Sequence, residues 1–112
     1  MKGELTKMAW IYLLVAGILE IVWAVGLKYS NGFTQVIPSI ITAISMIASY
    51  YFLALSIKVL PLGNAYAIWT GIGTVGTVAL GIILFKEPAT VMRFVCIGLI
   101  LAGIAGLKVL NV

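Results

Sequence analysis

One carboxylic acid lies inside an otherwise apolar stretch of the sequence, and its position makes it the first candidate for chemistry. The stretch LLVAGILEIVWAVGL, residues 13–27, holds fourteen uncharged residues and a single acid, Glu20. An ionised side chain at the centre of a bilayer costs at least about 2.5 kcal/mol, so such residues face protein or water and mark functional sites. The alternative is a structural Glu20 that pairs with a backbone or hydroxyl group.

The neighbours of Glu20 on the expected helix indicate what it holds. Residues three and four positions apart share a helical face, which places Gly17 and Trp23 beside the acid. A small residue one turn before the acid leaves room for a ligand or for a close partner helix. A carboxyl group shielded from water binds either a proton or a cation, but not both. Such exclusive occupancy is the minimal requirement for proton-coupled antiport.

Hydroxyl groups recur at helical spacing in the second apolar segment. A polar stripe on a membrane helix faces protein or a cavity and not lipid. Helix packing explains most such stripes, but Ser49 lies midway along its helix, at the expected depth of Glu20, and is the candidate site residue. The stripe comprises Thr42, Ser45, Ser49 and Ser56.

The third apolar segment contains two aromatic residues followed by three closely spaced glycines. Tyr66 and Trp69 are three positions apart and share a face, and aromatic rings near a buried acid suit a cation. The alternative is an interfacial aromatic belt. The string GIGTVG contains Gly71, Gly73 and Gly76. It is not a dinucleotide site, because that fingerprint requires a preceding strand. These glycines, with Gly17, are interpreted as positions for close packing or bending.

Composition requires a membrane protein. The chain has 112 residues, of which 63% are hydrophobic and 9% are charged, against about 25% charged residues in soluble domains. Basic residues are scattered, which argues against nucleic-acid binding. There is no His, and Cys96 is the single cysteine. The sequence therefore predicts no disulfide, no metal site, no cofactor and no enzymatic activity, and Cys96 is interpreted as a small core residue.

Four apolar segments are each long enough to span the bilayer as a helix of roughly 20 residues. Short connections with turn residues separate them, so consecutive helices are antiparallel neighbours. We expect one all-α transmembrane domain over residues 1–112, with residues 1–7 as a flexible extension before a second start at Met8. The predicted helices cover residues 8–28, 36–57, 62–85 and 89–110.

The positive charges are distributed almost evenly between the two expected membrane faces. Lys and Arg asymmetry normally sets the orientation of a membrane protein. Its near absence here predicts a chain that inserts both ways and forms an antiparallel homodimer, which is the inverted-repeat arrangement of larger transporters divided between two chains. A fixed topology is the alternative. One face carries Lys2, Lys7, Lys58 and Lys108, and the other carries Lys28, Lys86 and Arg93.

The fourth segment contains GLILAGIAG, residues 98–106, with no acid inside it. Small residues spaced along an apolar helix favour contact with another helix. We therefore interpret the small residues of this segment as the dimer seam and not as part of the site. They include Gly98, Ala102, Gly103 and Gly106.

Taken together, these motifs resemble the small multidrug resistance transporters. The acid in the first helix, GLKYSNGF, PLGNAYAIWTGIG and the glycine-rich fourth helix carry the resemblance over nearly the whole chain. LEIVWA and WTGIG resemble the guanidinium exporter subtype, because drug exporters of the family usually have a small residue at the position of Trp23. One departure is Asn64, where the family motif usually has Thr.

The resemblance implies a proton-coupled antiporter that works as an antiparallel dimer in the bacterial inner membrane, with protons as the coupling ion. By position, Glu20 matches the carboxylate shared by proton and substrate. Trp23 and Ser49 match residues that orient it, and Tyr66 and Trp69 match the aromatic lining. Some family members work only as pairs of unlike chains, so a paralogue is an alternative partner.

The chemistry of the expected site favours guanidinium or its small derivatives as the substrate. Guanidinium is planar, and its N–H edges match a carboxylate bidentately. A quaternary ammonium donates no N–H bond and needs the space that Trp23 occupies. Broad export of hydrophobic cations, a dual-topology ion channel and a non-transporting assembly factor are the alternatives.

Overall fold

The computed structural model describes the backbone of residues 2–110 and the side chains of residues 3–110. All four helices of this range are long and apolar enough to cross a membrane. They match the predicted all-α membrane fold. The helices are α1 (Lys2–Ser30), α2 (Val36–Ser56), α3 (Leu62–Phe85) and α4 (Val91–Leu110).

The first helix begins earlier than the sequence suggested. α1 starts at Lys2 instead of near Met8, so the segment expected to be a flexible extension is helical as far as the structure describes it. Only Gly3 in this segment is a poor helix former. Glu4 lies in the first turn, where a negative charge interacts favourably with the helix dipole.

The start of the fourth helix also differs slightly from the prediction. α4 begins at Val91 and not at Ala89. The Thr90 hydroxyl accepts a hydrogen bond from the backbone N–H of Arg93 at 3.2 Å. This contact satisfies one of the free N–H groups of the first turn, as an N-cap residue does, and therefore sets the boundary.

Two of the three connections contain residues with a left-handed backbone. Asn31 and Gly32 have φ values of 49° and 70° in the turn between α1 and α2, as expected of an Asn-Gly pair. Phe33 continues this conformation at φ 67°, and its N–H donates to the Ser30 hydroxyl at 3.1 Å. Lys86 ends α3 with φ 56°, so both connections reverse the chain within a few residues.

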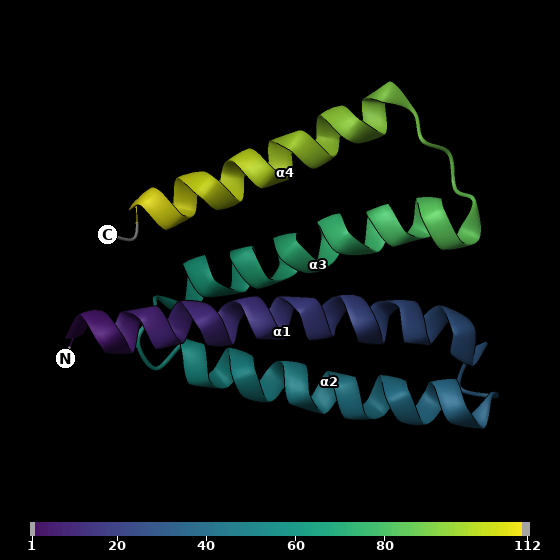
Figure 1. Ribbon diagram of the computed structural model, residues 1–112, viewed down its shortest axis with the longest axis horizontal. Coiled ribbons are helices and arrows are strands. Elements are labelled where there is room, and N and C mark those ends of the chain that lie inside the picture. The colour runs from purple at the N-terminus through teal and green to yellow at the C-terminus, as the bar shows by residue number, and fades with distance from the viewer. Residues whose placement is uncertain (1, 111–112) are drawn as a thin grey trace.

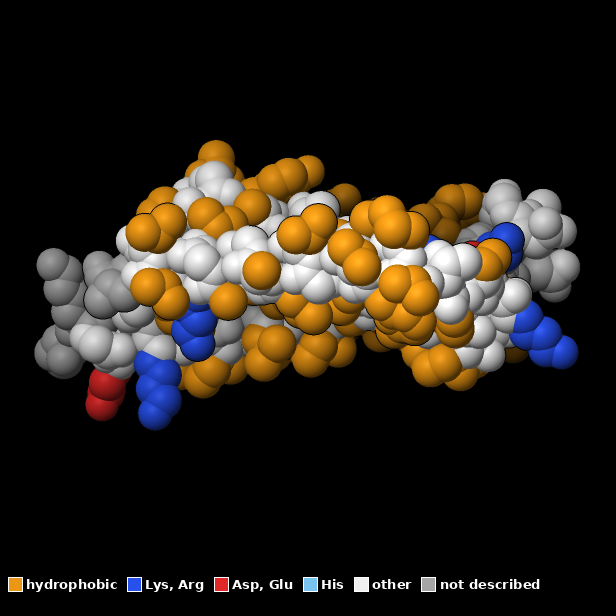
Figure 2. All heavy atoms as spheres, turned by 90° about the horizontal axis from the view of Figure 1, so that it is seen from above, with side chains coloured by type: hydrophobic (Ala, Val, Ile, Leu, Met, Phe, Trp, Pro, Cys, Tyr) orange, Lys and Arg blue, Asp and Glu red, His pale blue; other side chains and the backbone are white. Residues whose placement is uncertain are grey.

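The helices lie side by side in the spatial order α2, α1, α3, α4 (Figure 1). The result is a slab with extents of 45 × 35 × 17 Å. The chain termini and the α2–α3 connection lie at one end, and the other two connections lie at the opposite end (Figure 1). Apolar side chains cover the middle of the slab, and charged side chains lie towards its two ends (Figure 2). This distribution suits a bilayer.

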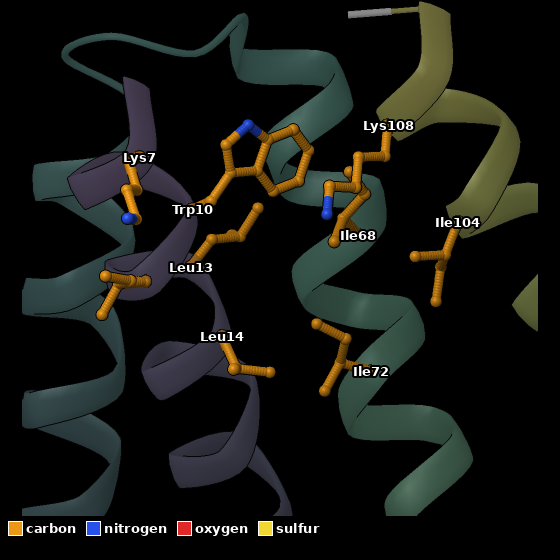
Figure 3. A pocket seen from close by; sticks show the side chains of 9 residues that line it. Lys7, Trp10, Leu13, Leu14, Ile68, Ile72, Ile104 and Lys108 are labelled. Atoms are coloured by element: carbon orange, nitrogen blue, oxygen red, sulfur yellow. The ribbon is translucent and has the colours of Figure 1, made fainter. Parts of the chain in front are cut away.

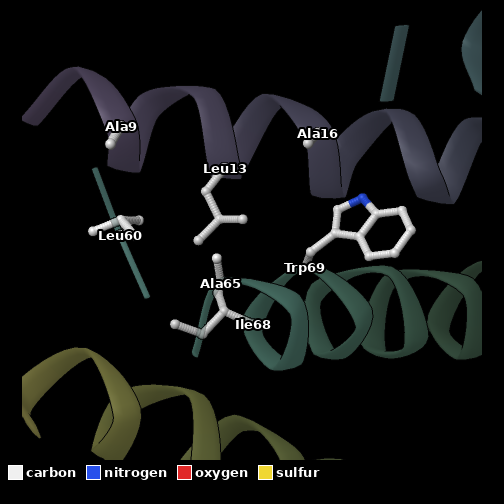
Figure 4. Packing of buried hydrophobic residues seen from close by; sticks show 7 residues of the cluster. All are labelled: Ala9, Leu13, Ala16, Leu60, Ala65, Ile68 and Trp69. Atoms are coloured by element: carbon white, nitrogen blue, oxygen red, sulfur yellow. The ribbon is translucent and has the colours of Figure 1, made fainter. Parts of the chain in front are cut away.

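The buried core lies mainly between α1 and α3, where small residues let the two helices approach closely (Figure 4). Ala16 is fully buried there and faces Trp69, which is 5% exposed. Among the described residues the backbone of α4 contacts that of α3 and not that of α1 or α2, and α4 has no buried residue. Cys96 of α4 is exposed and is not the small core residue that the sequence suggested. The core therefore holds the faces of α1 and α3 that carry the candidate site residues. Its members are Ala9, Leu13, Ala16, Leu60, Ala65, Ile68 and Trp69.

Candidate functional site

Glu20 lies between α1 and α3 at the edge of a cavity of about 270 Å³. Its Oε1 atom is buried and has no hydrogen-bond partner among the described residues. A buried polar atom without a partner costs about 1–3 kcal/mol. The carboxylate is therefore positioned for a proton or a ligand. The cavity is lined by Glu20, Ala24, Gly73, Thr74, Thr77 and Val78.

Gly73 creates the space that the Glu20 side chain occupies. A Cβ atom at position 73 would overlap the Glu20 carboxyl group and would lie 2.7 Å from its Cγ. The other site glycines contact apolar side chains instead: Gly17 meets Ile72, and Gly76 meets Ile21. These glycines bring α1 and α3 together on both sides of the acid. Gly71 faces outward, towards Ile104 of α4.

Ser49 joins three helices through one hydroxyl group. It donates to the backbone carbonyl of Ala16 at 2.7 Å and accepts from the indole N–H of Trp69 at 3.0 Å. Its proton is thus committed to α1, one turn before Glu20, and is not directed at the carboxylate. The resemblance implied that Ser49 orients the Glu20 carboxylate, whereas here its hydroxyl joins Ala16 and Trp69 and fixes the helices around the acid.

The remaining hydroxyls of the stripe serve helix packing. The whole stripe is buried on α2, as the polar-face argument predicted. Thr42, Ser45 and Ser56 donate to carbonyls of their own helix, at Pro38, Ile41 and Leu53. Ser49 is the member that reaches another helix.

Four aromatic rings from α1, α2 and α3 form a continuous series, and none of them is among the residues that line the Glu20 cavity. Tyr50 lies 6.4 Å from Trp23 and 5.5 Å from Trp69, between ring centroids. Tyr66 lies 5.5 Å from Trp69. The series brings together Trp23, Trp69 and Tyr66, which the sequence singled out. Tyr50 was missed, although it follows Ser49 directly in the α2 sequence.

Two further polar atoms near the middle of the slab are buried without a partner among the described residues. They are the indole Nε1 of Trp23 and the hydroxyl of Thr70. Neither residue is among those that line the Glu20 cavity. Thr70, Thr74 and Thr77 were missed by sequence reasoning. Their spacing along one side of α3 was the available signal.

The small residues of α4 lie apart from this site. Gly98, Ala102, Gly103 and Gly106 are all exposed. A Cβ atom at any of the three glycines would meet nothing within 4 Å. They leave a smooth apolar face of α4 free for another helix.

Glu20 is half-buried, and its Oε1 atom is buried without a partner among the described residues. An acid of this kind beside a cavity, in a molecule with four described apolar helices, defines the class as a small multi-pass membrane protein with an acidic site in its membrane-spanning part. The family model described as Small Multidrug Resistance protein matches residues 8–100. The chain therefore belongs to the Small Multidrug Resistance protein family.

Individual relatives match nearly end to end. The chain is similar to a protein of Yersinia pseudotuberculosis named "Guanidinium exporter", with 59% identity over 101 residues that cover 90% of this chain and 97% of the relative. Relatives with the same name in Citrobacter freundii and Salmonella typhimurium are 55% and 56% identical, and each match covers 90% of this chain and 96% of the relative.

Proposed function

We propose that this chain exports guanidinium across the bacterial inner membrane in exchange for protons, with Glu20 as the group that both ions occupy. The observation that carries the proposal is the buried, unpartnered Oε1 of Glu20 beside its cavity. The names of the three relatives support guanidinium as the substrate. We propose a transporter and not an enzyme.

Guanidinium matches the chemistry of this site. It is planar, always charged near neutral pH and able to donate two parallel N–H bonds to one carboxylate. The rings of Trp23, Tyr50 and Trp69 supply faces that attract such a cation. Short alkyl derivatives keep the same N–H edge and are included in the proposal.

Coupling to protons follows from competition for one group. A carboxyl that holds a proton has no charge with which to bind guanidinium, and a carboxylate that holds guanidinium excludes the proton. The transporter exposes its site to one side of the membrane at a time. If it can switch sides only with a proton or a guanidinium ion bound, the export of guanidinium is coupled to the import of protons. Under this proposal no bound cofactor is required.

We further propose that the working unit is an antiparallel homodimer. The exposed glycine face of α4 provides a seam, and the slab leaves the Glu20 cavity to be closed by a second copy. The nearly even distribution of positive charge allows both orientations. A paralogue of opposite orientation is the alternative partner.

The decisive experiment measures guanidinium-driven proton flux in liposomes that contain this chain alone. We expect flux from the wild type and none from Glu20→Gln, which keeps the shape of the side chain but cannot ionise. Glu87→Gln is the matched control, because Glu87 lies outside the helices, where it pairs with Arg93 at 3.2 Å. Flux that persists in Glu20→Gln would contradict the proposal.

The same liposomes separate the competing functions. A quaternary ammonium gradient tests the multidrug alternative, and robust transport of it without guanidinium transport would overturn the substrate assignment. Conductance without proton counterflow would indicate a channel. A non-transporting assembly factor predicts that Glu20→Gln cells behave like the wild type.

A further inference from the structure

A second cavity opens towards the end of the slab that holds both chain termini, and it shares no lining residue with the Glu20 cavity. It has a volume of about 320 Å³ and opens between α1, α3 and α4. We call it the α1–α4 groove, and it is bounded by Lys7 and Trp10 on α1, Ile72 on α3, and Ile104 and Lys108 on α4. The function proposed above uses none of these residues.

The groove has a cationic mouth. Lys7 and Lys108 approach it from opposite sides, and Trp10 lies between them (Figure 3). The Lys108 ammonium lies 5.5 Å from the centroid of a Trp10 ring. The ion pair found in the described part of the chain joins Arg93 and Glu87 at the other end, so neither groove lysine is in one. Two positive charges at the mouth are thus left for an anion.

Beyond its mouth the groove is apolar. Leu14, Ile72 and Ile104 line its inner part, further along the helices than the two lysines (Figure 3). Ile11 also lines it and is 46% exposed. An elongated apolar surface with cations at the membrane boundary matches an amphiphile with an anionic head.

We propose that the α1–α4 groove binds one anionic phospholipid, with its phosphate between Lys7 and Lys108 and an acyl chain along Ile11, Leu14 and Ile72. Trp10 lies within one turn of Lys7, near the N-terminal end of α1, and indole rings near the ends of membrane helices normally meet lipid headgroups. The lipid bridges α1 and α4, whose backbones do not contact each other. It therefore holds α4 in place against the other helices.

The groove and the proposed dimer seam occupy different faces of α4. Successive residues of a helix are rotated by about 100°, so Ile104 lies roughly opposite Ala102 and Gly106. A second copy seated on the glycine face leaves the groove open to the bilayer. Charge complementarity also favours a lipid over another copy, because an antiparallel second chain presents at this membrane face the opposite end of the slab (Figure 1). That end is itself basic, since it carries Lys28, Lys86 and Arg93.

The test is native mass spectrometry of delipidated protein mixed with equal amounts of phosphatidylglycerol and phosphatidylcholine that carry identical acyl chains. We expect retention of phosphatidylglycerol to be favoured, and to weaken about fivefold for each of Lys7→Gln and Lys108→Gln. Lys58→Gln is the matched control, since Lys58 lies at the same end but outside the groove. Equal retention of the two lipids by the wild type, or equal losses in the control, would overturn the proposal.

A second pair of variants tests the apolar part without changing charge. Ile11→Trp fills the groove and should reduce retention of both lipids severalfold. Ile47→Trp is the control, because Ile47 lies on α2 and is 71% exposed, and it should not change retention. Occupation by another copy gives a different result. In that case a photoreactive benzophenone attached to Ile11→Cys, made together with Cys96→Ser, labels a second chain efficiently in either relative orientation, and the lipid proposal fails.

Discussion

Three polar side chains in the described part of this molecule are unusual because each has a buried atom without a hydrogen-bond partner. Glu20, Trp23 and Thr70 each bury a polar atom without a partner among the residues that the structure describes. Each such atom costs about 1–3 kcal/mol relative to a satisfied one. Guanidinium only donates hydrogen bonds, so it can satisfy the Glu20 acceptor but not the Trp23 N–H donor. Part of the affinity for a small donor cation is therefore built into the unliganded Glu20 carboxylate.

Competition for Glu20 makes guanidinium binding dependent on pH in one direction. As the pH falls, protons occupy the carboxylate and guanidinium must displace them. The apparent affinity should therefore decrease on acidification, by at most about tenfold per pH unit for a single shared proton. Calorimetric titration of the purified protein over a series of buffers checks this. Affinity that is constant with pH, or that improves in acid, would rule out direct competition.

If guanidinium transport depends on the position of the Glu20 carboxyl group, replacing Gly73 by a residue with a side chain should impair transport. In Gly73→Ala the new methyl group overlaps the carboxyl group, so Glu20 must move out of its position between α1 and α3. We expect guanidinium flux to fall at least about tenfold, since misplacement by about 1 Å at a binding group has costs of this order.

Gly63→Ala is the control for Gly73→Ala, because it lies on the same helix and its new Cβ meets nothing within 4 Å. It should transport like the wild type. Full flux in Gly73→Ala, with a stable protein, would show that the site accommodates Glu20 in another position.

The helices around the site are fastened by Ser49. Replacement by Ala removes the bonds to Ala16 and Trp69 and leaves the buried Trp69 N–H without a partner. We expect Ser49→Ala to destabilise the protein by about 1–2 kcal/mol, measured by unfolding in mixed detergent micelles. Ser45→Ala, whose hydroxyl serves its own helix, should cost much less. Equal losses from the two variants would refute the role of Ser49 as a fastener.

Helix existence was predictable from sequence because apolar segments of bilayer length are unambiguous. The bounds of α3 were predicted as observed, whereas α1 extends to Lys2 because nothing in the polar residues before Met8 stops a helix. The buried hydroxyl stripe was also predictable, since polar groups avoid lipid. The acceptor of the Ser49 hydroxyl proton was not predictable from sequence. Whether Ser49 donates to Glu20 or to the Ala16 carbonyl depends on how α1 and α2 are rotated about their own axes. Tyr50 was missed for the same reason.

At the scale of the whole molecule, the slab leaves its polar site uncovered on one side. It is 17 Å across its shortest axis, and only α1 and α3 line the Glu20 cavity. α4 contributes no buried residue, although its exposed glycines suit close helix contact. A second copy would supply both the missing wall and the partner for α4.

The orientation of that second copy leads to a prediction based on charge. The two ends of the slab carry nearly equal numbers of Lys and Arg. A few exposed substitutions should therefore fix the chain one way or the other. Asn31→Lys, Gln35→Lys and Lys58→Gln move positive charge to the end with the α1–α2 connection. Val59→Lys and Lys86→Asn move it to the opposite end.

Reporter fusions at the C-terminus should find the wild type in both orientations. Each of the two sets of charge substitutions should give a chain with a single orientation. Each set alone should fail to protect cells from guanidinium, because two copies of equal orientation cannot form the antiparallel pair. Expression of both sets together should restore tolerance. If either set alone were protective, or if the wild type had a single orientation, the chain would function without an inverted partner. The Glu20 cavity would then have to be closed by α4 or by lipid instead.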